Sequence, residues 1–369
     1  MSLIDRCPSA MHRAALRLVG AALGGPVTQG LLEDLAQVDP VALAGLLNVQ
    51  HAHTVVAAVQ GRDPRLDAAL PEDLWLYLAE MRAANRDRMA LGVQDLGRIG
   101  ALLGGAGISA VVLKGGAEML DPLVNPAAIR FVSDLDILVP YDRAREAQAL
   151  LSGQSPDAVA FPDRIDAAVL HHLDPLHPEG HEFPIELHFH VGQSLVRRVL
   201  DAPGVLDRAT PSAVAGIALP SMRDRFLHHV LHYAKEHHAD HGLYLRGLVD
   251  HHAFRQALTA QDRAAAETSL RAAGLGHHLQ ILDALTDMVL GQDPGAMSPA
   301  TSRWLRRCLQ GFGSPARRRL SASLTLLYRV PWRFVTSRYY RRRYLGILRD
   351  PAVLKGELGL QRDRFGKLR

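Results

Sequence analysis

The sequence predicts an α/β (α+β) fold in which a few short strands lie between helical regions. Two short apolar runs rich in β-branched residues favour strands, Val111-Val112-Leu113 and Ile137-Leu138-Val139. A third segment, Pro184 to Val191, alternates apolar and polar side chains, which is typical of a strand with one buried face. The segments before and after these strands are rich in Ala, Leu and Val at helical spacing.

The helical segments can be placed from their spacing and from their end signals. Residues 11–23 and 40–59 show mixed three- and four-residue apolar spacing. Pro71-Glu72-Asp73 suits the start of a longer helix, which Gly104-Gly105-Ala106-Gly107 would end. After the strands, Ser221 with Asp224 three residues on is typical of a helix N-cap.

We therefore expect four regions along the chain. They are a helical N-terminal region (1–84), an α/β core (85–200), a second helical region (201–293) and an Arg-rich helical C-terminal region (294–369). A chain of 369 residues is long enough for two or three structural units.

Composition indicates a soluble globular protein, with 48% hydrophobic and 22% charged residues. Two distant cysteines, Cys7 and Cys308, argue against a disulfide scaffold and for a reducing compartment. The N-terminus lacks the pattern of a signal peptide, because Asp5 and Arg17 interrupt it. No run of 18 apolar residues is present, so we expect no transmembrane span and a cytoplasmic location.

Positive charge is concentrated near the C-terminus. Residues 294–349 contain 13 Arg and no Lys, Asp or Glu. Aromatic residues are interleaved with these Arg over 302–346, which allows contact with nucleic acid through phosphate pairing and base stacking. An interfacial helix on an anionic membrane is a second interpretation, and amphipathic helices with Arg outside and aromatics inside are a third.

The strongest chemical signal is a pair of aspartates at the second strand. Side chains alternate along a strand, so Asp134 and Asp136 share a face and lie about 6.6 Å apart along it. Two carboxylates this close favour one or two bound divalent cations, because burying like charges without a cation is costly. In the third strand, Glu186 and His188 share a face, and Glu186 would supply a third acid.

Together these motifs resemble one known family. Leu113-Lys114-Gly115-Gly116, Arg130, Ser133-Asp134-Leu135-Asp136-Ile137-Leu138-Val139 and Ile185-Glu186-Leu187-His188 occur in the order of the uncharacterised nucleotidyltransferase family of the DNA polymerase β-like superfamily. The resemblance covers most of the chain. It implies a minimal nucleotidyltransferase mixed sheet flanked by helices, with an NTP as substrate.

The resemblance also implies the roles of the site residues. Asp134, Asp136 and Glu186 would hold two Mg²⁺ ions, with Mn²⁺ as an alternative, and would be the catalytic residues. The predicted nucleotide-binding residues are Lys114, Gly115, Gly116, Arg130, Ser133 and His188. Glycines allow backbone to approach phosphate closely, and Lys or Arg neutralises phosphate charge. The acceptor is open: a small molecule, a peptide, a protein or RNA.

Other interpretations stay open at this point. Gly115-Gly116 also suits a simple strand-to-helix turn, and Ser133 a local loop-ordering bond. His228 and His232 have the helical spacing of a zinc pair, although helix packing is the more common role of such residues. Alternatives to the general nucleotidyltransferase are a toxin-type nucleotidyltransferase, a non-catalytic protein that binds nucleic acid or membrane, and a His-metal hydrolase.

Overall fold

The protein contains a mixed five-stranded sheet, where the family resemblance implied a mixed sheet and the sequence indicated three of its strands. The computed structural model describes residues 3–123, 130–159, 170–234 and 243–314, with 331, 335 and 341. The sheet has the strand order β3-β2-β1-β5-β4. Its strands are β1 (Val111–Val112), β2 (Leu135–Leu138), β3 (Ile185–His188), β4 (Thr210–Pro211) and β5 (Ala218–Leu219).

Both strand directions occur in the sheet. β1 pairs antiparallel with β2 and parallel with β5, β2 pairs parallel with β3, and β4 pairs antiparallel with β5. The three strands expected from the sequence are confirmed. β1 and β3 are shorter than the segments predicted for them, whereas β2 begins two residues before its apolar run, at Leu135, and ends at Leu138. The strand with Glu186 is the direct neighbour of the strand with Asp136.

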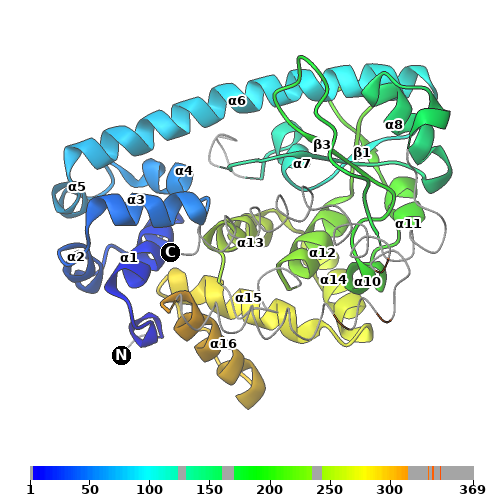
Figure 1. Cartoon of the computed structure of the whole chain (residues 1–369). Helices are drawn as coiled ribbons and strands as arrows, with labels where there is room; N and C mark the ends of the chain where they lie inside the picture. The colour runs from blue at the N-terminus through cyan, green and yellow to red at the C-terminus, as the bar shows by residue number, and fades with distance from the viewer. Residues whose placement is uncertain are drawn as a thin grey trace.

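Helices surround the sheet (Figure 1). The N-terminal helices are α1 (Ala10–Ala22), α2 (Gln29–Leu35), α3 (Pro40–Val49), α4 (His53–Val56), α5 (Pro64–Ala69) and α6 (Glu72–Gly105). The helices between strands are α7 (Lys114–Leu120), α8 (Ala144–Ser152), α10 (Ser194–Arg197) and α11 (Ala202–Asp207). The later helices are α12 (Met222–Tyr233), α13 (Leu245–Ala257), α14 (Ala260–Ala272), α15 (Gly276–Val289) and α16 (Pro299–Phe312).

Helix α6 connects the two halves of the molecule. Its 34 residues run from the group α1–α5 to the sheet, along the upper edge in Figure 1. The helix begins directly after Pro71 and ends at Gly105, as the sequence predicted. It passes without a break through residues 84 and 85, and the sheet includes strands at 210–219. The division of the chain into four regions stays a prediction.

The sheet separates two apolar cores because its side chains alternate between faces. Leu135, Ile137, Ile185 and Leu187 face a core that includes residues of α6 and α8. Leu138, two residues after Asp136, belongs to the larger core, which includes residues of α12, α13 and α15. The polar residues of β2 and β3 therefore stand on the face toward α12 and α13.

Helix ends follow ordinary capping chemistry. The Ser221 hydroxyl accepts a hydrogen bond from the Asp224 backbone N–H at 3.2 Å, so the predicted N-cap is confirmed. Thr28, Asp39 and Thr259 cap α2, α3 and α14 in the same way. Each cap satisfies a backbone donor that the first helical turn leaves unpaired.

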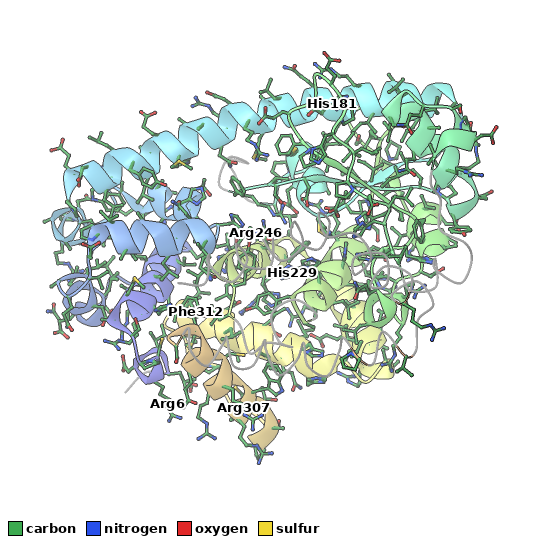
Figure 2. The ribbon with its side chains drawn as sticks, viewed as in Figure 1. Arg6, His181, His229, Arg246, Arg307 and Phe312 are labelled. Carbon is green, nitrogen blue, oxygen red and sulfur yellow. The ribbon has the colours of Figure 1, made fainter. Side chains whose placement is uncertain are left out.

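Part of the Arg-rich segment is visible in α16. Arg303, Arg306 and Arg307 are exposed, while Phe312 is fully buried. Figure 2 shows Arg307 pointing away from the molecule and Phe312 pointing into it. This helix has Arg outside and apolar residues inside. Most of 302–346 lies outside the described residues, so contact with nucleic acid or membrane through this segment stays a prediction.

No single helix among the described residues has both the length and the apolar character needed to cross a bilayer. Within the described ranges, one pair of consecutive segments, Pro40–Val49 and His53–Val59, has that length and composition when taken together, and it is bent by 119° at the junction.

Candidate active site

Two carboxylates meet across the parallel pair of β2 and β3. Asp136 and Glu186 are register partners, so both side chains leave the same face of the sheet next to each other. Asp136 is 1% exposed, whereas Glu186 is partly buried. Asp134 directly precedes β2 and is half-buried, with a hydrogen bond from the Ser133 hydroxyl at 3.0 Å. The sheet therefore brings together two of the three predicted acids in direct register.

His188, at the end of β3, contacts both of these acids. Its Nε2 lies 2.8 Å from Asp136 Oδ1 and 3.7 Å from Glu186 Oε2. Its Nδ1 faces the His190 carbonyl oxygen at 3.2 Å, so Nδ1–H donates to the backbone. The His188 side chain is completely buried. His188 thus contacts a carboxylate of each of the two strands, while its predicted contact with nucleotide stays a prediction.

Lys114 brings a positive charge to the same carboxylate. Its Nζ lies 2.5 Å from Asp136 Oδ1. Lys114 is the first residue of α7 and has φ of 47°, a left-handed conformation that costs energy in a residue with a side chain. Such conformations concentrate at functional sites. The sharp passage from β1 into α7 thus places the ammonium group against Asp136.

The pKa shifts follow from these contacts. Burial alone would raise the pKa of Asp136, but Lys114 and His188 hold it well below its usual range. Burial would lower the pKa of Lys114, yet the carboxylates, Asp136 foremost, raise it. Burial and the neighbouring Asp136 raise the pKa of Asp134. The site therefore keeps Asp136 ionised and Lys114 charged.

The acids and His188 form a group that can hold a metal ion. One ligand atom from each of Asp136, Glu186 and His188 lies within 4.8 Å of the other two. Asp136 Oδ2 is buried and has no hydrogen-bond partner among the described residues. A buried carboxylate oxygen without a partner is costly, and a cation is one common explanation. The residues present therefore fit a divalent cation, with Asp134 next to the group but not part of it.

Gly115 and Gly116 follow Lys114 inside α7, and packing requires both to lack a side chain. A Cβ on Gly116 would lie 2.3 Å from a methyl carbon of Val112 in β1. A Cβ on Gly115 would lie 2.5 Å from the guanidinium of Arg130. The two glycines thus let α7 pack closely on the sheet and let Arg130 approach it. Their predicted contact with phosphate stays a prediction.

Arg130 is held by an acid from a distant helix. Its Nε donates to both carboxylate oxygens of Asp250 in α13, at 3.1 and 3.2 Å. Both side chains are largely buried. Burial alone would raise the pKa of Asp250, but Arg130 and Arg246 hold it below its ordinary value. The guanidinium, a candidate phosphate ligand, is therefore fixed in place.

Three side chains anchor the segment that leads into Asp134. Asn85 Nδ2 donates to the Arg130 carbonyl oxygen at 3.1 Å, and Arg246 donates to the Phe131 carbonyl at 3.1 Å. Arg88 donates to the next carbonyl, that of Val132. These donors come from α6 and α13, so two helices fix the backbone immediately before the acids.

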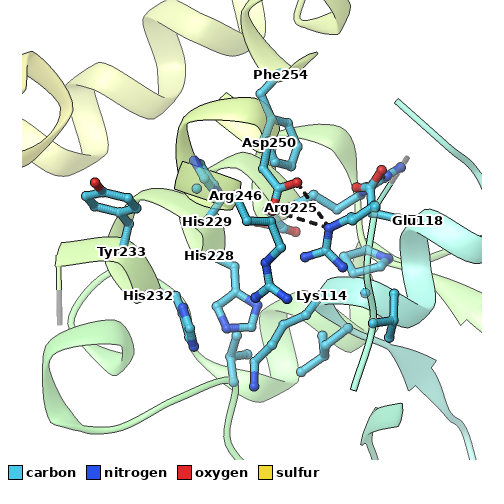
Figure 3. Close-up of a pocket in the computed structure, with 18 of the residues that line it drawn as sticks. Lys114, Glu118, Arg225, His228, His229, His232, Tyr233, Arg246, Asp250 and Phe254 are labelled. Carbon is cyan, nitrogen blue, oxygen red and sulfur yellow. Dashed lines mark hydrogen bonds and ion pairs between the residues drawn. The ribbon is translucent and has the colours of Figure 1, made fainter. Parts of the chain in front are cut away.

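Two pockets border the acids, and Lys114 lines both of them. The first pocket includes Asp134, Arg130, Arg225, Arg246 and aromatic residues of α12 and α13. Figure 3 shows Lys114, His228 and His232 toward one end of this pocket and Asp250 and Phe254 toward the other. The second pocket contains Glu186 and four histidines, His171, His172, His228 and His232. We call the first pocket the cation-rich side, although four carboxylates also line it, and the second the imidazole-rich side; His228 and His232 line both.

His228 and His232, the candidate zinc pair, and the nearby described histidines of α12 and α13 do not join a metal group of this kind. Among the residues that the structure describes, the one group of three metal-ligating side chains is that of Asp136, Glu186 and His188. His229, central in Figure 2, stacks on His251 and packs against Phe254. His251 contacts Asp283, whereas Asp250, the preceding residue in the chain, contacts Arg130. The two consecutive residues therefore have different partners. His237, His238 and His241 lie outside the described residues.

Several residues at the site are not among the site residues predicted from the sequence. Asn85, Arg88, Arg246 and Asp250 reach the site only because α6 and α13 pack beside it. Glu118 and Arg225, a buried pair with a distance of 2.7 Å, line the first pocket in the same way. The partners in these contacts are 44 to 120 positions apart in the chain. Local spacing cannot reveal contacts of this kind.

A mixed sheet with carboxylates on neighbouring strands, beside a pocket lined by Lys and Arg, defines a class of protein suited to metal-assisted phosphate chemistry. A comparison with protein-family models shows to which family of that class the chain belongs. A model of the uncharacterised nucleotidyltransferase family matches residues 39–291, more than half of the chain, and the chain belongs to this family. Searches of curated proteins and of solved structures gave no match.

Proposed function

We propose that this protein is a nucleotidyltransferase that moves a nucleoside monophosphate from an NTP to a hydroxyl or phosphate of an acceptor, with Mg²⁺ or Mn²⁺ as cofactor. The observation that carries the proposal is the register pairing of Asp136 with Glu186 next to Lys114. Family membership supports nucleotidyl transfer in general. The individual roles below are our assignment.

Asp136 and Glu186 would hold the divalent cation, and we assign a second ion to Asp134, which lies two residues before Asp136 in the chain. When bound, the cation supplies positive charge next to the reacting phosphate. An acceptor oxygen would attack the α-phosphorus while the bond to pyrophosphate breaks. Lys114 and Arg130 would offset the charge on the phosphate oxygens during that exchange.

The two pockets suggest how the substrates share the site. The first pocket is lined by Lys114, Arg130, Arg225 and Arg246, which can contact a triphosphate. Four carboxylates line it as well, and two of them, Asp250 and Glu118, pair with Arg130 and Arg225. The second pocket adjoins Glu186, which would bind the ion nearer the acceptor and accept its proton. We therefore assign the NTP to the cation-rich side and the acceptor to the imidazole-rich side. Small molecules, peptides, proteins and RNA stay candidates for the acceptor.

The proposal is tested by label transfer. The full chain would be incubated with each NTP labelled at the α-phosphate and with acceptor pools of each class, with Mg²⁺ or Mn²⁺. We expect label in one pool with the wild type, and at least about 100-fold less with Asp136→Asn or Glu186→Gln, because an activity that depends on a metal fails without its ligands. Asp142→Asn, at an exposed position, is the matched control. Transfer that persists in Asp136→Asn would refute the assignment.

A further inference from the structure

We infer that His188 is itself a metal ligand, so that the site is a mixed nitrogen and oxygen site that favours Mn²⁺ or another first-row transition ion over Mg²⁺. This inference deepens the proposed function, because it concerns the cation of the same site. An all-carboxylate set of Asp134, Asp136 and Glu186 was expected from the sequence. In the structure His188 belongs to the group in place of Asp134.

The first support is the orientation of the imidazole ring. The Nδ1–H of His188 donates to the His190 carbonyl at 3.2 Å, which directs Nε2 toward the two acids. A histidine that binds a metal typically donates its other ring N–H to a carbonyl or carboxylate, which fixes the tautomer and the ring. The carbonyl here belongs to a segment that is itself held, because the His190 backbone N–H donates to the His171 carbonyl. The ring is thus preorganised for ligation through Nε2.

The second support is independent and comes from Asp136. In the metal-free protein Asp136 Oδ1 accepts from Lys114 and from the protonated Nε2 of His188, a proton that metal ligation would displace, whereas Oδ2 has no hydrogen-bond partner among the described residues. The side chain is 1% exposed, so solvent does not compensate that oxygen. A cation bound by Asp136, Glu186 and His188 Nε2 would satisfy all three groups. We therefore assign His188 as a ligand of the cation, and not only as a residue that lies next to the two acids.

The donor chemistry gives the class of metal. Mg²⁺ prefers oxygen ligands and near-ideal octahedral geometry, and protein imidazoles bind it weakly. Imidazole nitrogen suits first-row transition ions, and carboxylate oxygen is compatible with them as well. Mn²⁺ accepts both kinds of donor. A set of one imidazole and two carboxylates thus shifts the preference from Mg²⁺ toward Mn²⁺ and its neighbours in the series.

His172 is a natural control for this role. Its ring lies 5.2 Å from that of His188, and its Nε2 is 4.0 Å from Glu186 Oε2. It is on the segment that pairs antiparallel with β3, through a bridge to His188. His172 is therefore close to the same acids without being part of the metal group.

The direct experiment is pulsed electron paramagnetic resonance of Mn²⁺ bound to the metal-free full chain, without nucleotide. Ligation by imidazole couples a ¹⁴N nucleus to the ion. We expect this coupling in the wild type and in His172→Gln, and its loss in His188→Gln. Coupling that persists in His188→Gln, or bound Mn²⁺ without ¹⁴N coupling in the wild type, would overturn the inference. Failure of the wild type to bind Mn²⁺ would overturn it too.

Calorimetric titration gives a second readout on the same proteins. Loss of a ligand should weaken Mn²⁺ binding by about 10–100-fold in His188→Gln. Mg²⁺ binding should change much less, because it depends on the carboxylates. An equal loss for both ions would show that His188 acts only through Asp136. His188→Asn serves as a second variant if His188→Gln fails to fold.

These measurements separate the inference from the proposed function. Neither the resonance experiment nor the calorimetric titration measures nucleotidyl transfer. A protein that binds Mn²⁺ through His188 but transfers no label would therefore contradict only the proposed function. A protein that transfers label with Mg²⁺ and shows no ¹⁴N coupling would contradict only the inference.

Discussion

Lys114 and His188 contact the same oxygen of Asp136, one from the start of α7 and the other from the neighbouring strand. Two positive or hydrogen-bond-donating groups thus converge on one oxygen of a buried carboxylate. The charge of Asp136 is compensated by protein groups in this arrangement, and a bound cation would take over part of that task.

This relationship predicts that Lys114→Met destabilises the metal-free protein. Removing one partner of a buried ion pair leaves a charge uncompensated, which typically costs about 3–5 kcal/mol of unfolding free energy. We expect urea denaturation without metal to show a loss of about 3 kcal/mol. Addition of Mn²⁺ should recover part of this loss, because a cation at Asp136 replaces the ammonium charge.

Arg86→Met, at an exposed position of α6, is the control and should change stability by less than about 1 kcal/mol. A Lys114→Met protein as stable as the wild type without metal would contradict this account.

Packing between Gly115 and Arg130 gives a second prediction. Gly115→Ala places a Cβ 2.5 Å from the Arg130 guanidinium and 2.6 Å from Val132. We expect a loss of about 1–3 kcal/mol in unfolding free energy, because these neighbours must move. Gly97→Ala, in the same kind of helical setting in α6 but with nothing within 4 Å of its Cβ, should be neutral or stabilising by up to about 1 kcal/mol. Urea denaturation of both variants measures the contrast. Equal effects would show that α7 is not packed as described.

The Arg130–Asp250 pair predicts strong coupling in a double-mutant cycle. Each side chain is less than 15% exposed. Either Asp250→Asn or Arg130→Met alone therefore leaves the other side chain as a buried charge without its ion-pair partner. We expect each single change to cost about 3 kcal/mol, and the double variant to cost clearly less than the sum. Asp87→Asn, which removes one partner of an exposed pair with Arg86, should cost less than about 1 kcal/mol. Additive single effects at Arg130 and Asp250 would exclude the coupling.

Three neutral histidines, buried or partly buried, predict that stability falls as the pH is lowered. Burial lowers the pKa of His229 to about 3, and the pKa values of His51 and His278 to about 4, from an ordinary value of 6.5. Between these values the unfolded chain binds more protons than the folded one, so unfolding free energy rises with pH there. Stability is therefore fully present above about pH 6.5 and is lost progressively as the pH falls below it.

The measurement is the urea midpoint between pH 7.5 and pH 5. The wild type should lose stability over this range, and His229→Gln should lose less because one proton-linked site is gone. The Gly97→Ala protein keeps all 19 histidines and should show the wild-type slope. An unchanged slope in His229→Gln would show that this residue is not the neutral buried group described.

Much of the fold was predictable because it depends on local patterns. The strands at Val111, Ile137 and Ile185 follow from runs of β-branched or alternating residues, and α6 follows from Pro71 and its Gly-rich end. The pairing of β4 with β5 was not predictable, because each strand is only two residues long and carries no periodic signal. The same holds for the anchoring of residues 130–132 by Asn85, Arg88 and Arg246, which depends on how α6 and α13 pack.

The sequence by itself determined the chemistry available at the site: the Asp-Leu-Asp and Glu-Leu-His motifs, the Lys-Gly-Gly turn and their order. Alternation along a strand is a property of the backbone, so it also determined that Glu186 and His188 share a face. Only the tertiary structure decided which of these groups meet. The parallel register sets Asp136 against Glu186, and burial brings His188 and Lys114 onto one oxygen while Asp134 stays at the strand entrance. Contacts of this kind depend on the packing of elements far apart in the chain, and no local pattern encodes that packing.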